Sequence, residues 1–357
     1  MNRILLVRTS AIGDLVFASP FVAALRRRYP DAHIAWLVEP GLDGLLAADP
    51  CIDELILWPK AEWKRLWRER RLAELRRAVR AFAATLKARD FDTAIDMQSL
   101  FKSGWLAWLS GAPRRIGLGS REGSRWLMTE VVPAGGTPGQ ISSEYRHLAR
   151  HLGLDTDHFL PRLAVADDNT RKARALLAEH GLAPRRYAVF APFTTRPQKH
   201  WSEDGWQALA RRVREEFGLA AVILGGPSER EAARRIALAA PGAVALAGAT
   251  SLPEAAALVA QAGLVIGVDT GLTHMGSAFG TPTVALFGST RPYLDAGRPD
   301  ARVIWLGLAC SPCRRRPSCG GSHDCLHDIH PGRVMDEART VLAHQAQRRG
   351  HHKEKAA

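Results

Sequence analysis

The stretch at 264–278, LVIGVDTGLTHMGSA, has the pattern of a turn that binds an anion. A short apolar run leads into Asp269-Thr270-Gly271, and a helix-like segment follows, which predicts a strand, a tight turn and the start of a helix. The first amides of a helix lack partners within it and the helix dipole makes that end electropositive, so its backbone can hold a phosphate. Gly271 allows a ligand to come close.

His274 lies four residues after Thr270, so the two side chains share one helical face and could both point at one diphosphate. The alternative is that Asp269 and Thr270 only cap the helix and that His274 is a structural histidine. The stretch alone leaves both interpretations open.

Asp14 follows a second strand-and-turn pattern near the start of the chain. An apolar run at 4–7 leads into RTSAIGD, and an amphipathic pattern extends from 15 to 28. Only Gly13 stands where a dinucleotide fingerprint would need three spaced glycines. A carboxylate at a helix start is ionised and can accept a proton at neutral pH, although the helix dipole also weakens it as a base. A helix cap is the alternative for Asp14.

Two further loops follow predicted strands and carry groups that bind nucleotides. The first, PFTTRPQKHW at 192–201, contains Thr194, Thr195 and Lys199, and lysine serves phosphate as a point charge. The second, GGPSE at 225–229, places Glu229 where a carboxylate could accept a ribose hydroxyl.

Four of the five cysteines lie close together in a loop rich in glycine and arginine. Their spacing, C-x2-C-x5-C-x5-C, is compact enough for a structural zinc or iron site with four thiolate ligands, but the second pair lacks the x2 spacing of zinc ribbons. The alternative is four reduced thiols in an ordered loop. The residues are Cys310, Cys313, Cys319 and Cys325.

Alternating strands and helices must position all these loops. This alternation predicts an α/β protein in which parallel sheets are covered on both faces and ligands bind at the carboxyl ends of the strands. The pattern occurs twice, and an irregular region from 153 to 186 separates the halves. We expect strands at 4–7, 34–38, 55–58, 93–96, 187–191, 221–224, 244–245, 264–268 and 283–287.

Length and charge limit the classes of protein. With 357 residues, 46% of them hydrophobic, the chain can bury two cores. No apolar run approaches the roughly 20 residues of a membrane helix, and Arg8 interrupts the apolar start, so we expect a cytoplasmic protein. The formal charge of +13 favours polyanionic partners.

The segment from Lys60 to Asp90 holds eleven lysines and arginines against four acids. Trp63 and Trp67 lie four residues apart in it, on one face of a predicted helix. A solvated helix face, with the tryptophans in the core, is the alternative to a surface that meets an anionic acceptor or a membrane.

Together these motifs resemble those of glycosyltransferase family 9, the heptosyltransferases of lipopolysaccharide inner-core synthesis. The resemblance covers nearly the whole chain. TTRPQKHW and WLVEPG at 36–41 are most similar to the heptosyltransferase I branch, whereas CSPCRRRPSC is more similar to the heptosyltransferase II branch. The motifs are TSAIGD at 9–14, QSLFKS at 98–103, TTRPQKHW at 194–201 and DTGLTHMGSA at 269–278.

The family resemblance implies the GT-B architecture, with two doubly wound Rossmann-like domains facing across a cleft. We expect an acceptor domain at 1–160 and a donor domain at 161–328. A C-terminal helix at 329–349 is expected to return to the N-terminal domain, and a tail at 350–357 to be disordered.

The resemblance also implies inverting transfer of heptose from ADP-L-glycero-D-manno-heptose to Kdo-lipid A, with no cofactor required for catalysis. Asp14 would be the general base, Glu229 would hold the ribose, and Thr250 would line the adenine pocket. Lys64, Lys102 and Arg121 would bind the anionic acceptor. The diphosphate would lie among Thr194, Thr195, Lys199, Asp269, Thr270, Gly271 and His274.

Two alternatives to this function remain open. A family 9 enzyme could act on a later core sugar or on a protein acceptor. A non-catalytic basic protein could bind nucleotides or nucleic acid, but the chain shows no recognition helix or basic repeat, and we expect no nucleic-acid partner. The expected location is peripheral, on the cytoplasmic face of the anionic inner membrane.

Overall fold

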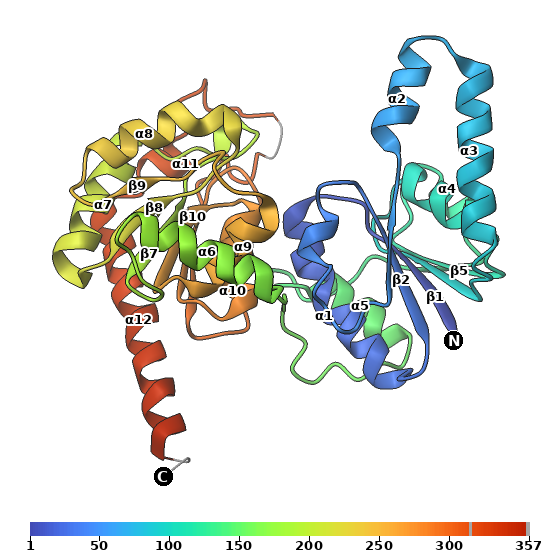
Figure 1. Cartoon of the computed structure of the whole chain (residues 1–357), viewed down its shortest axis with the longest axis horizontal. Coiled ribbons are helices and arrows are strands. Elements are labelled where there is room, and N and C mark those ends of the chain that lie inside the picture. Colours follow the sequence, from blue (N-terminus) through green and yellow to red (C-terminus); the bar gives the residue numbers. More distant parts are fainter. Residues whose placement is uncertain (314–315, 355–357) are drawn as a thin grey trace. The chain divides into compact units, whose positions relative to one another are not determined.

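The computed structural model describes residues 1–313 and 316–354 and divides into two compact units (Figure 1). Unit 1 consists of Met1–Thr137 and Ser142–Ala164, and unit 2 of Pro138–Ile141 and Val165–Ala357. The sequence pattern put the boundary at 160/161. It did not reveal that the short segment Pro138–Ile141 belongs with the C-terminal half.

Unit 1 is built on six parallel strands in the order β3-β2-β1-β4-β5-β6. Its central strands are buried apolar runs, as expected for parallel strands covered on both faces. The chain moves outward from β1 to β3 and then returns to β4 beside β1, so the loops after β1 and β4 meet at a topological switch point. The strands are β1 (Arg3–Val7), β2 (His33–Val38), β3 (Glu54–Leu57), β4 (Thr93–Asp96), β5 (Arg114–Leu118) and β6 (Glu130–Val132).

Unit 2 repeats the plan with the order β12-β11-β10-β7-β8-β9, all parallel. Its switch point therefore lies between β7 and β10. The doubly wound α/β prediction is confirmed for both halves. The strands are β7 (Tyr187–Ala191), β8 (Ala220–Ile223), β9 (Val244–Ala245), β10 (Leu264–Val268), β11 (Thr283–Phe287) and β12 (Ala301–Trp305).

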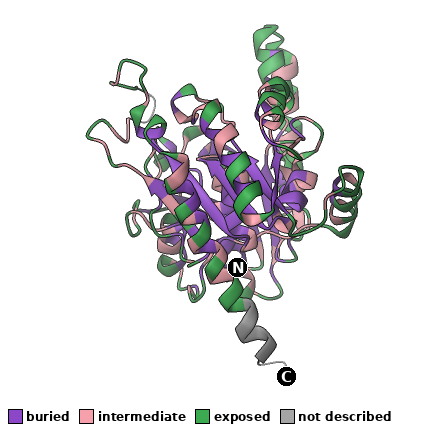
Figure 2. Cartoon of the chain, turned by 90° about the vertical axis from the view of Figure 1, so that its left-hand side faces the viewer, coloured by how far each residue is buried: buried purple, intermediate pink, exposed green. Residues whose placement is uncertain are grey.

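Helices cover the faces of both sheets, so that buried strands lie beneath helices with exposed outer faces (Figure 2). No helix in the described part of the chain is long and apolar enough to cross a membrane. Unit 1 contains α1 (Ile12–Arg28), α2 (Lys60–Arg68), α3 (Leu72–Lys87), α4 (Phe101–Leu109) and α5 (Ser143–His151). Unit 2 contains α6 (Asp167–Glu179), α7 (Glu203–Phe217), α8 (Arg230–Leu238), α9 (Leu252–Gln261), α10 (Gly271–Phe279), α11 (Asp324–His327) and α12 (Pro331–Glu354).

The basic segment at 60–90 forms a helical hairpin, α2 and α3, rather than the one helix that its composition suggested. The helices are separated at 69–71, where Arg70 has a positive φ of 56° that an α-helix cannot accommodate. Trp63 is buried at the base of the hairpin, against Trp58, Phe82 and Trp105, whereas Trp67 is 66% exposed. The core interpretation therefore holds for one of the two tryptophans only.

The C-terminal helix α12 packs on unit 2. Val334, Met335, Ala338 and Val341 belong to the same buried cluster as the β10 and β11 side chains. Its apolar face is thus buried within unit 2, and the expected return of the helix to the N-terminal domain stays a prediction. Helix α12 also continues to Glu354, past the expected end at 349, so the tail predicted to be disordered is helical at 350–354. Residues 355–357 of that tail lie outside the described residues.

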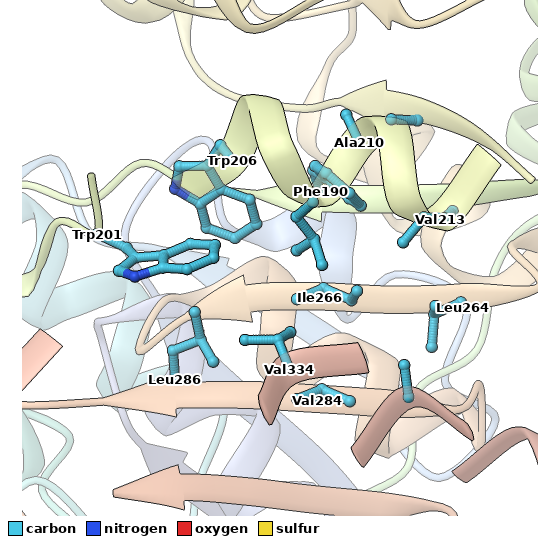
Figure 3. Close-up of a cluster of buried hydrophobic side chains, with 14 of the residues drawn as sticks. Phe190, Trp201, Trp206, Ala210, Val213, Leu264, Ile266, Val284, Leu286 and Val334 are labelled. Atoms are coloured by element: carbon cyan, nitrogen blue, oxygen red, sulfur yellow. The ribbon is translucent and has the colours of Figure 1, made fainter. Parts of the chain in front are cut away.

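Trp206 on α7 is central to the core of unit 2 (Figure 3). Its ring is 1% exposed and lies 5.1 Å from the ring of Trp201 and 5.3 Å from that of Phe190. We expect Trp206→Ala to lower the free energy of unfolding by about 3–5 kcal/mol, because a large buried ring leaves a cavity. Urea unfolding followed by circular dichroism measures the change. Trp126→Ala, at an 83% exposed ring, is the control and should shift it by less than about 0.5 kcal/mol.

Candidate active site

Asp269 is the centre of a charged cluster at the switch point of unit 2. Its Oδ2 accepts a hydrogen bond from Thr290 Oγ1 at 2.6 Å and lies 2.7 Å from the ammonium of Lys199. Its Oδ1 lies 3.1 Å from Nε2 of His274. Lys199 comes from the segment after β7, Asp269 directly follows β10 and Thr290 follows β11. Three strand ends therefore bring these groups together.

The cluster holds its carboxylate ionised. Burial would raise the pKa of Asp269, but the contacts with His274 and Lys199 outweigh it and hold the pKa well below its usual range. In turn, the carboxylate keeps the Lys199 ammonium at this strand end, with only 15% of that side chain exposed. The result is a fixed cation beside the start of α10.

His274 is buried and both of its ring nitrogens have partners. Nδ1 lies 2.8 Å from the hydroxyl of Tyr293, and Nε2 faces Asp269. The rings of Phe287 and Tyr293 pack against the imidazole at centroid distances of 6.2 and 5.5 Å. His274 is thus placed to orient Asp269.

The N-terminus of α10 has no side-chain cap, so the capping alternative for Asp269 and Thr270 does not apply. Thr270 is the N-cap residue in extended conformation, and Gly271 opens the helix. Gly267 of β10 allows α10 and β7 to lie close to its strand, because a Cβ there would lie 2.1 Å from Thr273 Oγ1 and 2.8 Å from the Ala191 Cβ. The first amides of α10 therefore remain available for an anion near Lys199.

The remaining predicted donor residues lie at neighbouring strand ends of the same unit. Thr194 and Thr195 stand in the loop after β7, where the Thr194 carbonyl lies 2.8 Å from Nε2 of His200. Glu229 ends the short 3-10 helix η4 (Pro227–Glu229) after β8, and Thr250 precedes α9 after β9. All four follow β7, β8 or β9, so they belong to the edge of the sheet that carries Lys199 and Asp269.

Asp14 stands at the switch point of unit 1, in the first turn of α1. Its Oδ2 accepts a hydrogen bond from the amide of Ala11 at 3.2 Å and an ion pair from the guanidinium of Arg8. The cap interpretation and the base interpretation are thus compatible, because one carboxylate oxygen caps the helix. The side chain is 43% exposed, and Oδ1 forms no hydrogen bond or ion pair with any described residue. Oδ1 is the oxygen that can take a proton.

Arg8 is a buried guanidinium that fixes Asp14. Its Nη1 donates to the carbonyl of Met97 at 3.2 Å, and its own carbonyl accepts a hydrogen bond from the Trp36 indole at 3.0 Å. A charge this deeply buried needs a partner, and the Asp14 carboxylate supplies it. Arg8 was not predicted as a site residue from the sequence, although a charged residue directly after a buried strand is a signal for a site.

Asp96, at the end of β4, is a second buried carboxyl group near Arg8. Its Oδ1 accepts hydrogen bonds from the amides of Gln98 and Ser99 at 2.9 and 3.3 Å. Burial outweighs these contacts and raises the pKa of Asp96 to about 6. The folded state therefore binds this proton more tightly than the unfolded chain, in which an aspartate has a pKa of roughly 3.9.

This raised pKa predicts a pH-dependent stability. The stabilising contribution of Asp96 to the free energy of unfolding is fully present below about pH 3.9. It is lost as the pH rises through about 6, because the ionised form is disfavoured in the core. The difference in unfolding free energy between Asp96→Asn and the wild type should therefore shift by about 1.4 kcal/mol in favour of the variant from pH 5 to pH 8. Urea unfolding at the two pH values checks this. A constant difference between the two proteins would contradict it.

The predicted acceptor residues stand in three places in unit 1. Lys102, in the first turn of α4, lies with its ammonium 5.9 Å from the Trp58 ring, and burial and the charge of Lys60 lower its pKa. Arg121 follows β5, and its amide donates to the Ser99 carbonyl at 2.8 Å. Lys64 is exposed on α2. Lys102 and Arg121 are thus near the switch point, whereas Lys64 lies on the hairpin.

The four clustered cysteines lie at different depths in the loop that carries them. Among the described residues, no three His, Cys, Asp or Glu side chains are grouped so that they could hold a metal ion. Cys310 is exposed, Cys313 and Cys319 are half-buried, and Cys325 is buried in α11. Burial raises the pKa of Cys325 to about 11. We assign this loop no catalytic role.

Comparisons with known proteins agree with this geometry. The model of glycosyltransferase family 9 (heptosyltransferase) matches residues 79–322. Lipopolysaccharide heptosyltransferase 1 of Pseudomonas aeruginosa is 32% identical over 317 residues, which cover 88% of this chain and 86% of that protein. Lipopolysaccharide heptosyltransferase 2 of Escherichia coli K12 is 28% identical over 366 residues, covering 95% and 98%.

The fold has close counterparts among solved structures. A family 9 glycosyltransferase from Veillonella parvula superimposes with a TM-score of 0.82 at 22% identity, covering 96% of this chain and 98% of that one. Two six-stranded parallel sheets with helices on both faces are the GT-B architecture. The chain therefore belongs to glycosyltransferase family 9, the heptosyltransferases, and is a glycosyltransferase with the GT-B fold.

Proposed function

We propose that this enzyme of lipopolysaccharide core synthesis transfers heptose from ADP-L-glycero-D-manno-heptose to Kdo-lipid A, with inversion at the anomeric carbon. The observation that carries the proposal is the Lys199–Asp269 pair beside the uncapped start of α10, a site suited to the diphosphate of a nucleotide sugar. The acceptor is supported by the 32% identity to the heptosyltransferase 1 of P. aeruginosa.

The reaction divides between the two units. In unit 1, Asp14 Oδ1 takes the proton from the attacking acceptor hydroxyl, whose oxygen forms a bond to the anomeric carbon. The bond from that carbon to the diphosphate oxygen breaks at the same time, and ADP leaves with the electron pair. In unit 2, the Lys199 ammonium and the amides of Thr270 and Gly271 stabilise the charge that develops on the diphosphate.

The other predicted residues take supporting roles in this proposal. His274 orients Asp269, Glu229 accepts the ribose hydroxyls, and Thr250 lines the adenine site. Thr194 and Thr195 add hydroxyl donors to the diphosphate. On the acceptor side, the cations Lys64, Lys102 and Arg121 would pair with the carboxylates of Kdo and the phosphates of lipid A.

Transfer from ADP-heptose to Kdo2-lipid A is the direct test. Product formation by the wild type, followed by mass spectrometry, supports both the donor and the acceptor. If the protein binds ADP-heptose but leaves this acceptor unmodified, the acceptor assignment is wrong. If it does not bind ADP-heptose, the donor assignment is wrong as well. The anomeric configuration of the product, read from proton couplings, tests inversion.

A second acceptor is favoured by one observation. The cysteine loop CSPCRRRPSC resembles the heptosyltransferase II branch, and the E. coli heptosyltransferase 2 aligns with 95% of this chain. We therefore propose a later core sugar, the heptose already attached to Kdo, as the alternative acceptor, with a protein acceptor ranking below it. Offering both lipopolysaccharide acceptors in one competition assay separates the two, because the preferred one is consumed first.

Location and cofactors are part of the same proposal. We place the enzyme in the cytoplasm, peripherally at the anionic inner membrane that carries its lipid acceptor. We expect transfer to proceed without an added metal. A structural zinc or iron in the cysteine loop remains a prediction, which elemental analysis of the purified protein tests.

A further inference from the structure

We propose that the α2–α3 hairpin, called the arm below, docks on an anionic bilayer surface through its tip, residues 67–72. The inference deepens the membrane association proposed above by assigning it to particular residues. It does not depend on the sugar that is transferred, because vesicle binding is measured without donor or acceptor.

The arm is a rigid support whose inner face is already filled. Trp63 and Leu66 of α2 are buried, and Trp63 lies edge-on to Phe82 of α3 at a centroid distance of 5.5 Å. At the base, Trp105 of α4 contacts the same indole at 5.8 Å. The two helices lie side by side and extend away from the sheet of unit 1 (Figure 1). The arm therefore presents its tip without needing a partner to hold it in shape.

Two large apolar side chains at the tip are not used by this packing. Trp67, in the last turn of α2, is 66% exposed, and Leu72, the first residue of α3, is 54% exposed. They flank the turn on both sides. Tryptophan has an apolar ring and a polar N–H, and it prefers the boundary between water and lipid.

The charges around this pair have one predominant sign. Between 65 and 74 the chain has four arginines and two glutamates. Arg65 and Arg71 form ion pairs with Glu69, and Arg71 also pairs with Glu74. Arg68 and Arg70 form no ion pair with any described residue.

Charge complementarity selects the occupant. Two unpaired guanidinium groups beside an exposed tryptophan and leucine match a layer of lipid phosphates above acyl chains, where arginine binds phosphate and the apolar groups enter the boundary. A protein partner would have to present both acidic groups and an apolar pocket to the six residues of the tip. An anionic bilayer supplies both everywhere on its surface.

Vesicle flotation tests the proposal on the full-length protein, with vesicles of phosphatidylcholine alone and of phosphatidylcholine with 30% phosphatidylglycerol. We expect binding to the anionic vesicles only. Arg68→Ser with Arg70→Ser should weaken it about 30-fold, since each cation near such a surface contributes about one factor of five. Trp67→Ser with Leu72→Ser should weaken it at least tenfold, and this loss should persist at low salt, where charge attraction is strongest.

Two matched pairs serve as controls. Arg171→Ser with Arg234→Ser removes the same charge from unit 2, and Trp126→Ser with Leu238→Ser removes an indole and a leucine that are 83% and 87% exposed. Both control proteins should bind like the wild type and melt at similar temperatures. Equal losses in control and tip variants would overturn the proposal in favour of diffuse charge attraction. Equal binding to neutral vesicles, or unchanged binding by both tip variants, would overturn it outright.

Discussion

Asp14→Asn should lower kcat for heptose transfer by about 10²–10⁴-fold, the range that a positioned general base contributes. The asparagine amide oxygen can still accept the hydrogen bond of Ala11, so helix α1 keeps its cap. What is lost is the proton acceptor. Initial rates with saturating donor and acceptor measure the effect.

The interpretation of this variant depends on two controls. Its binding of ADP should equal that of the wild type, because the proposed diphosphate site lies in unit 2. Its melting temperature must be compared as well, because the buried guanidinium of Arg8 loses an ionic partner. A folded variant that retains more than a tenth of the wild-type kcat would remove Asp14 from the role of base.

Lys199→Met should lower kcat by about 10²–10³-fold, as expected when one preorganised donor to a leaving group is removed. Methionine is an apolar replacement that leaves out the charge. Affinity for intact ADP-heptose should fall less than kcat, because the diphosphate gains negative charge as its bond to the anomeric carbon breaks. Single-turnover rates and ADP-heptose titration by calorimetry separate the two effects.

Lys172→Met is a suitable control for this change. Lys172 is an exposed lysine of the same unit, paired with Asp168 at 2.8 Å, and it lies on α6 rather than at the switch point. Its replacement should leave kcat within a factor of two. If Lys199→Met weakened ADP-heptose binding and left kcat unchanged, the lysine would bind substrate and transition state equally, and leaving-group catalysis would have to come from elsewhere.

The fold was predictable because its central strands are strongly patterned. Runs such as 264–268 and 284–287 contain no polar side chain, which is the pattern of a parallel strand buried on both faces. Three strands nearer the sheet edges were missed. β5 begins with two arginines, β6 has three residues, and β12 carries Arg302 on an exposed position. A strand near the edge of a sheet needs fewer apolar residues, so the sequence pattern that identifies it is weaker.

The candidate sites were predictable where one motif holds the whole signal. Asp14 and Asp269 each lie where a buried strand leads into a helix, so their places at the switch points follow from the order of elements. The partners could not be predicted in the same way. Thr290 contacts Asp269 and Tyr293 contacts His274, each from about twenty residues further along the chain. Only the packing of β11 beside β10 brings them near.

The wrong expectations also have physical reasons. Composition shows that the segment at 60–90 is helical and basic, but it does not locate a break that depends on a single positive φ at Arg70. Similarly, the prediction of a helix at 329–349 does not say against which strands that helix packs. Val334 and Val341 pack with the strands of unit 2, a contact decided by chain geometry.

The segment Pro138–Ile141 limits how this enzyme can be recombined. It belongs to unit 2, where its backbone pairs with Asp295 through the Ile141 amide and the Gly139 carbonyl, both at 2.9 Å. The chain consequently passes between the units at 137/138, 141/142 and 164/165. A chimera joined only at 164/165 would bring a foreign segment to the Asp295 loop. Exchanging whole units between family members therefore requires that these four residues be taken from the parent that supplies unit 2.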